Sequence, residues 1–114
     1  MKQFQLFRSQ IKLLLAVALL SLMTGRAIAA EVVVEIWKMQ FRPQEITVKK
    51  GTVIRWKNIE KRQYHSVWFE KSGDPEPDYF FPEESYTRRF KTKGDFPYRC
   101  GPHPEMTGVV HVVD

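Results

Sequence analysis

The stretch from Gly94 to Val113 reads GDFPYRCGPHPEMTGVVHVV and combines two short β-type runs with a loop rich in turn residues. The β-type runs are residues 96–99 and 108–113, because each is short, carries aromatic or β-branched residues and is bounded by turn residues. The loop between them places a thiol, an imidazole and a thioether at intervals of three residues: Cys100, His103 and Met106. This strand–loop–strand unit predicts a β domain that holds three ligand-type side chains in one loop.

The sequence before this unit is also β-like. Five further runs are rich in β-branched or aromatic residues or alternate between apolar and polar residues: 31–37, 45–49, 52–56, 64–69 and 85–90. None of these stretches has a convincing helical period. Several short strands with turn signals at close spacing predict an all-β domain, either an antiparallel sandwich or a barrel.

The one long irregular segment covers residues 71–82 and contains a glycine and three prolines. Acidic side chains are frequent in it and directly after it: Asp74, Glu76, Asp78, Glu83 and Glu84. We interpret this segment as a solvated surface loop, with a docking patch for a partner as the alternative.

The first residues have the pattern of a targeting segment. A basic start is followed by an apolar run over residues 13–22, and Ala27 and Ala29 supply the small residues of a cleavage site. This order predicts a cleavable signal peptide over residues 1–29 and a domain over residues 30–114. A retained membrane anchor is the alternative, but the run is far shorter than the ~20 residues that a spanning helix needs. We therefore expect export to the periplasm and no membrane span after cleavage.

Removal of the leader changes the charge of the protein. The chain has 18 Lys and Arg and 13 Asp and Glu; four of the basic residues and none of the acidic ones precede residue 30, which leaves a net charge of +1. This balance gives no reason to expect a nucleic-acid partner. Cys100 is the only cysteine, so a disulfide within the chain is impossible. In an oxidising compartment such a thiol is expected to be buried, bonded to another chain or bound to a metal.

Thiolate, thioether and imidazole ligands together favour copper over hard cations, and two His, one Cys and a weak axial Met define the blue-copper site. The second His must come from outside the loop. His65 is the better candidate because it begins a β-type run behind a loop, whereas His111 lies in the last run on the same face as Val109 and Val113 and is expected at the surface. Zinc is the main rival metal, although a structural zinc site would more often use paired Cys or Cys/His knuckles and has little use for a Met.

Motifs along almost all of residues 31–114 are similar to those of one family. They are MQFxP from residue 39, ITVxxGTVxxWxN from residue 46, His65-Ser66-Val67, and GDFPYRC from residue 94. The spacing Cys-x-x-His-x-x-Met, with a proline on each side of the His, is of the amicyanin type. On these residues the chain resembles the cupredoxin (blue copper protein) family, and within it amicyanins, plastocyanins and pseudoazurins most.

The resemblance implies a Greek-key antiparallel β-sandwich of the cupredoxin type, with one type 1 copper ion near one end. The ligands that the family pattern assigns are three strong ones and a weak axial one: His65, Cys100, His103 and Met106. It also implies that the electron leaves through the exposed edge of His103, within a small apolar docking patch that includes Pro102 and Pro104.

One pair of residues departs from the family pattern. Asn58 resembles the family asparagine that links the His65 loop to the ligand loop, usually through a Ser or Thr after the Cys. Gly101 occupies that position here and has no hydroxyl. We therefore expect Asn58 to bond at most to the backbone near Cys100, without the side-chain link.

The ligand set and the resemblance predict a monomeric blue copper protein that carries single electrons between periplasmic redox partners. A dehydrogenase or a c-type cytochrome is the expected transient partner. The alternative is an exported copper-binding protein for copper storage or delivery without a redox partner. An enzyme is not expected, because no acid/base pair lies near the loops and Met106 would close the site. A metal-free adhesion sandwich would leave the four ligand-type residues as coincidence.

Overall fold

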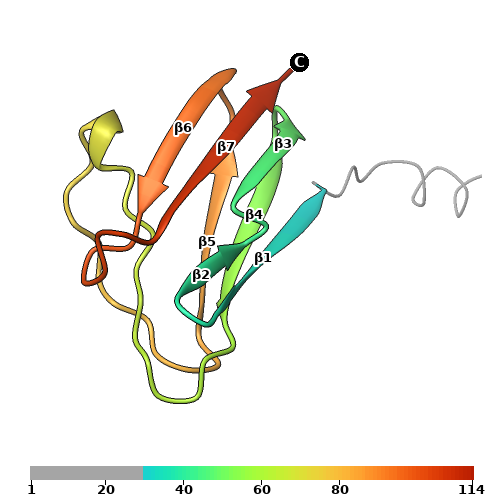
Figure 1. Ribbon diagram of the computed structural model, residues 1–114. Helices are drawn as coiled ribbons and strands as arrows, with labels where there is room; N and C mark the ends of the chain where they lie inside the picture. Colours follow the sequence, from blue (N-terminus) through green and yellow to red (C-terminus); the bar gives the residue numbers. More distant parts are fainter. Residues whose placement is uncertain (1–29) are drawn as a thin grey trace, which may run out of the picture.

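The computed structural model describes residues 30–114, so the predicted signal peptide lies outside the described residues. Within this range the chain forms two β-sheets packed face to face, with strand orders β2-β1-β4-β5 and β3-β7-β6 (Figure 1). The strands are β1 (Glu31–Trp37), β2 (Gln40–Arg42), β3 (Glu45–Lys49), β4 (Thr52–Asn58), β5 (Ser85–Phe90), β6 (Gly94–Arg99) and β7 (Thr107–Val113), and the 3₁₀ helix η1 is Glu70–Ser72. The predicted all-β sandwich is confirmed.

The pairing within the sheets is mixed. β1–β2, β4–β5 and β6–β7 are antiparallel, whereas β1–β4 and β3–β7 are parallel. The parallel pairs arise because the chain alternates between the sheets: β3 lies in the sheet opposite β1 and β4, so β4 returns beside β1 in the same direction. The last strand, β7, joins the two other strands of its sheet.

The strand expected over residues 64–69 is wrong. This segment makes only two isolated bridges, His65 with Phe80 and Trp68 with Arg99. Residues 65–67 are all buried, whereas a strand at a sheet surface alternates its side chains between two faces. The segment is therefore a buried connection and not a strand of either sheet, and its polar residues His65 and Ser66 lie in the interior.

A short strand was missed by the pattern. β1 and β2 form a hairpin in which Trp37 pairs with Gln40 across a two-residue turn. Both turn residues, Lys38 and Met39, have positive φ values, of 51° and 58°. Such turns usually carry Asn-Gly or Asp-Gly, so Lys-Met gives no sequence signal for the hairpin.

Trp56 is the centre of the core. The alternation of β4 places Ile54 and Trp56 inside and Arg55 outside. The Trp56 indole is fully buried, packs on four aromatic rings, and donates a 3.1 Å hydrogen bond from Nε1 to the Tyr98 hydroxyl. The rings around it come from both sheets and from the β4–β5 connection: Phe69, Tyr86, Phe90 and Tyr98.

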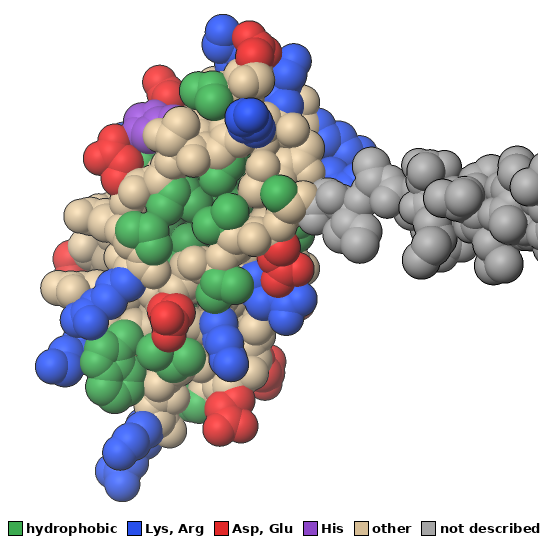
Figure 2. Space-filling model, turned by 90° about the vertical axis from the view of Figure 1, so that its right-hand side faces the viewer, with side chains coloured by type: hydrophobic (Ala, Val, Ile, Leu, Met, Phe, Trp, Pro, Cys, Tyr) green, Lys and Arg blue, Asp and Glu red, His purple; other side chains and the backbone are tan. Residues whose placement is uncertain are grey.

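The long connection between β4 and β5 runs along β6 and lies beside the loop between β6 and β7, at the end of the sandwich away from the C terminus (Figure 1). Figure 2 shows a face on which basic and acidic side chains are interspersed around an apolar area, in keeping with the small net charge of residues 30–114. Among the described residues there is no helix of sufficient length and apolarity to cross a membrane.

His111 lies at the surface of the β3-β7-β6 sheet, as predicted. Its Nδ1 is 2.6 Å from Asp95 Oδ1 on β6, and its Nε2 contacts the Glu45 carboxylate on β3. The hydrogen bond to Asp95 is the main cause that raises the pKa of His111 above 6.5, and the bond to Glu45 adds to it. This imidazole therefore ties three strands together when it is protonated.

We expect the His111 tie to make stability depend on pH. Because the folded pKa is raised, its contribution is fully present below the unfolded value of 6.5 and is lost as the pH rises through the folded pKa. The measurement is the free energy of urea unfolding of the protein and of His111→Gln, below pH 6.5 and well above it. The difference between the two proteins should shrink with rising pH, and a constant difference would contradict the prediction.

Candidate metal centre

Three of the four predicted ligands converge. The possible ligand atoms of His65, Cys100 and His103 all lie within 4.8 Å of one another. Cys100 Sγ is 3.6 Å from His65 Nδ1 and 3.5 Å from His103 Nδ1. Cys100 directly follows β6, His103 lies in the loop after it, and His65 comes from the β4–β5 connection. Segments 35 residues apart in sequence thus bring one sulfur and two ring nitrogens to one point.

Backbone hydrogen bonds hold these residues in place, both in the ligand loop and in the segment that contains His65. In the ligand loop, the Cys100 N–H donates to Met106 O at 2.9 Å, and the Met106 N–H donates to His103 O at 3.0 Å. His65 is held by a reciprocal pair of hydrogen bonds with the backbone of Phe80, at 3.0 and 2.8 Å. Met106, whose side chain is buried, is therefore tied to both of the other ligand-type residues of its loop.

The electrostatics of the cluster favour a neutral imidazole and a protonated thiol when no cation is bound. Burial lowers the pKa of His65 to about 4, with a further lowering by His103 and an opposing effect of Glu60. Burial also raises the pKa of Cys100, although the Ser66 N–H, 3.4 Å from the sulfur, partly opposes this. A bound cation would stabilise the thiolate. One buried sulfur beside two imidazole nitrogens is a donor set that fits copper.

Glu60 supports the far side of the His65 ring. His65 Nε2 is buried and has no hydrogen-bond partner among residues 30–114, and Glu60 Oε1 lies 3.9 Å from it. The same oxygen accepts the Met39 N–H at 2.6 Å, which anchors the carboxylate to the β1–β2 turn. At 3.9 Å the contact with the His65 ring is electrostatic and not a hydrogen bond, and the Glu60 charge raises the pKa of His65 against the effect of burial. Sequence reasoning missed Glu60, because its position depends on the unpredicted hairpin.

The Asn58 side chain bonds to the loop that leads to His65. Its Nδ2 donates to Gln63 O at 2.8 Å and lies 3.4 Å from Phe80 O, while its Oδ1 accepts the Glu60 N–H at 3.0 Å. None of these bonds reaches the backbone near Cys100. Asn58 instead closes the loop that follows β4, which positions the segment before His65.

Ser66 links the His65 segment to the ligand loop, which is the link that the family pattern gives to Asn58. Its hydroxyl oxygen accepts the Gly101 N–H at 2.8 Å, and its own N–H points to Cys100 Sγ at 3.4 Å. The hydroxyl that joins the two loops thus comes from the His65 side, and the ligand loop contributes the Gly101 N–H and the Cys100 sulfur. The sequence shows a serine next to His65, but it does not show that this serine is buried and that its hydroxyl faces Gly101.

Ser66→Ala is expected to lower the free energy of unfolding of the metal-free protein by about 1–3 kcal/mol, because it leaves the Gly101 N–H without its acceptor. The Gly101 amide should also exchange its hydrogen faster. Both effects are measured by urea unfolding and by amide hydrogen exchange, with Ser85→Ala at an exposed site as the control. Unchanged exchange at Gly101 would show that the hydroxyl does not hold this amide.

An exposed aromatic cluster, Tyr64, Tyr79 and Phe81, borders His103. The rings of Tyr64 and Tyr79 are stacked with centroids 5.4 Å apart, and Phe81 packs against Tyr64 at 5.9 Å. The Tyr64 ring is 6.1 Å from that of His103. The sequence pointed to Pro102 and Pro104 beside His103, both of which have exposed surface, but it gave no sign that the β4–β5 connection adds these rings.

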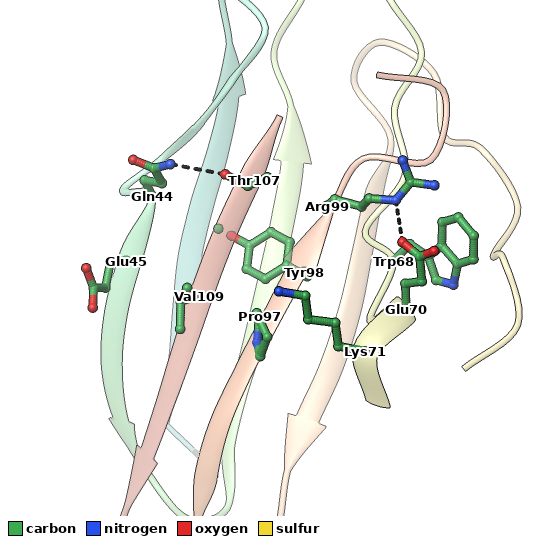
Figure 3. Close-up of a pocket in the computed structure, with 11 residues that line it drawn as sticks. Gln44, Glu45, Trp68, Glu70, Lys71, Pro97, Tyr98, Arg99, Thr107 and Val109 are labelled. Atoms are coloured by element: carbon green, nitrogen blue, oxygen red, sulfur yellow. Dashed lines mark hydrogen bonds and ion pairs between the residues drawn. The ribbon is translucent and has the colours of Figure 1, made fainter. Parts of the chain in front are cut away.

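A separate groove of about 450 Å³ lies on the outer face of β6 and β7, beside η1 (Figure 3). Arg99 packs over the Trp68 ring at 4.6 Å from its centroid, and its Nε is 2.7 Å from Glu70 Oε2, an ion pair without hydrogen-bond geometry. None of the three converging residues lines this groove. It is therefore not part of the metal centre.

The comparisons with known proteins agree with this geometry. A family model described as copper binding proteins, plastocyanin/azurin family, matches residues 28–113. Amicyanin-alpha of Methylorubrum extorquens is 35% identical over 83 residues, which is 69% of each chain. Amicyanin of Paracoccus versutus is 38% identical over 89 residues, 74% of this chain and 66% of that protein.

A solved structure supports the same assignment. The crystal structure of amicyanin from Paracoccus versutus superimposes with a TM-score of 0.68 at 33% identity, over 79% of this chain and 87% of that one. The resemblance found in the sequence motifs is thereby confirmed. The chain belongs to the plastocyanin/azurin family of copper-binding proteins.

Proposed function

We propose that this protein is a type 1 copper protein that carries single electrons between redox proteins of the periplasm. The observation that carries the proposal is the convergence of Cys100 Sγ with the Nδ1 atoms of His65 and His103, in a chain of the copper-binding family. Met106, from the same loop as Cys100 and His103, would be a further and weaker ligand. When bound, copper supplies a one-electron couple, in which Cu(II) takes an electron from a reduced donor and Cu(I) returns it to an oxidised acceptor.

The surroundings of the cluster support electron transfer rather than catalysis. Cys100 and His65 have no exposed surface, and the Met106 side chain is buried. A substrate therefore cannot reach the Cys100 sulfur or the His65 ring from solvent. An electron can reach a buried site without such an opening. The hydrogen bonds of Ser66 and of the ligand-loop backbone hold the ligand atoms in place, which keeps the change of geometry between two oxidation states small.

His103 would be the point of electron exit. Its side chain is partly exposed, and it lies between Pro102, which is partly exposed, and Pro104, which is exposed. A transient partner, a dehydrogenase or a c-type cytochrome, would dock on this patch, and the carrier would act as a monomer. The basic start and apolar run of residues 1–29 support export.

Copper storage or delivery is the alternative function, and electron exchange separates it from the first. The test loads the purified protein with Cu(II), reduces it, and mixes it with an oxidised c-type cytochrome in a stopped-flow instrument. A carrier should be reoxidised reversibly without loss of metal. Transfer of copper to a chelator that outpaces any electron exchange would instead support storage or delivery.

Pro104→Glu should slow this exchange several-fold, because it places a charge in the apolar patch where the partner must approach closely. Val33→Glu is the matched control, since Val33 is an exposed apolar residue on β1 outside the patch. The measurement is the second-order rate constant for each variant. Equal rate constants for the two variants would place the docking patch elsewhere.

A further inference from the structure

Gly101 lies in a space that has no room for a side chain. A Cβ atom at this position would be 2.5 Å from Glu76 Oε1 and 2.8 Å from Ser66 Oγ. Both distances are shorter than carbon and oxygen atoms tolerate without a bond between them. A side chain at this position would have to displace the buried Ser66 hydroxyl and the end of the Glu76 side chain, so the glycine leaves room for both, and the Glu76 carboxylate lies against the residue directly after Cys100.

Glu76 reaches this position from the acidic segment between η1 and β5. Its Oε1 accepts a 3.3 Å hydrogen bond from the Tyr79 hydroxyl, and Tyr79 in turn stacks on Tyr64. The segment is anchored at its start, where Asp74 pairs with Arg88 at 2.7 Å. The carboxylate is thus presented to the ligand loop from a loop that is fixed on both sides of it.

We propose that Glu76 is a positioning residue of the metal centre, which braces the Cys100–Gly101 segment and places a negative charge beside it. The inference rests on the proposed function, because the charge has its effect on a copper ion held by Cys100. The hydroxyl of Ser66 and the carboxylate of Glu76 together fill the space that a side chain at position 101 would take.

The charge has a predictable consequence for the redox equilibrium. Copper(II) with a thiolate carries one more positive charge than copper(I) with the same thiolate. A fixed negative charge nearby therefore stabilises the oxidised form more and lowers the reduction potential. Because Glu76 is largely exposed, solvent and salt screen the interaction.

Glu76→Gln is the direct test, because it keeps the size of the side chain and removes the charge. We expect a higher reduction potential than in the unmodified protein, and a shift that decreases as the ionic strength is raised. Asp78→Asn is the matched control, since it removes the same charge from an exposed site two residues further along the loop. Its shift should be clearly smaller.

A second measurement needs no copper. Gly101→Ala is made in the unmodified chain and in Glu76→Ala, and the free energy of urea unfolding is measured for the metal-free proteins. The added methyl group must displace both Glu76 and Ser66 in the first case but only Ser66 in the second. We therefore expect Gly101→Ala to be less destabilising when Glu76 is absent.

The outcomes separate this inference from the proposed function. Equal potential shifts for Glu76→Gln and Asp78→Asn, a shift that does not respond to salt, or equal losses of stability in the two Gly101→Ala proteins would each overturn the role of Glu76. Failure of the unmodified protein to bind copper would overturn the proposed function instead, and the inference with it.

Discussion

Cys100→Ser is expected to abolish the intense visible band of the copper-loaded protein. The band needs a copper–thiolate bond, and a serine hydroxyl is a hard ligand that does not ionise near neutral pH. Cys100 Sγ lies within 3.6 Å of the Nδ1 atoms of both His65 and His103. Its replacement should weaken copper binding by more than the roughly 10–100-fold that loss of a supporting residue costs.

The measurement is a copper(II) titration followed by visible and paramagnetic resonance spectra. Ser66→Ala is the matched control, because it alters the hydrogen bonding next to the sulfur and keeps the thiolate. It should retain a blue band. A blue band in Cys100→Ser, or an unmodified protein that binds zinc and stays colourless with copper, would contradict the assignment of the site.

Trp56→Ala is expected to lower the free energy of unfolding of the metal-free protein by about 3–5 kcal/mol. The indole is fully buried, and its removal leaves a cavity among rings of both sheets and the Tyr98 hydroxyl without its donor. Domains of this size have a total stability of roughly 5–15 kcal/mol, so the loss is a large part of it.

Copper should restore much of this stability, because only the folded chain brings the ligands together. Binding to the folded state alone adds about 2.7 kcal/mol at a free concentration of 100 times the dissociation constant. Urea unfolding with and without copper measures both effects. Trp37→Ala, at a partly exposed tryptophan of β1, is the control and should lose much less. Similar losses in the two variants would show that Trp56 is not the centre of the core.

Local patterns were sufficient to predict most strands and the metal cluster. The bounds of β1, β3 and β5 follow from β-branched runs and alternation, which depend only on neighbouring residues. The spacing of three residues between Cys100 and His103 predicted that their side chains lie close together, because two residues so near in a tight loop cannot be far apart. His65 required the family resemblance, since the sequence offered three histidines.

The parts that could not be predicted depend on contacts between distant segments. Residues 65–67 look like a strand, but all three are buried and the segment makes only isolated bridges instead of a continuous ladder with a sheet. Ser66 replaces Asn58 as the link between the loops, and Gly101 is explained only by the oxygen atoms that surround it. Because the Gly101 backbone N–H donates to the Ser66 hydroxyl, this link between the two loops needs no side chain at position 101.

The parallel pairing of β3 with β7 also determines when the metal centre can form. Glu45 pairs with Val109 and Lys49 with Val113, so the last strand closes the largest loop in the domain. Closure of such a loop costs chain entropy before the new contacts compensate for it, and folds dominated by distant pairings fold in milliseconds to seconds. Cys100 and Met106 lie between β6 and β7 and reach their final positions only with that closure. The ligand loop is therefore held in place only once β7 has paired, and we expect copper binding to follow this step when the domain folds.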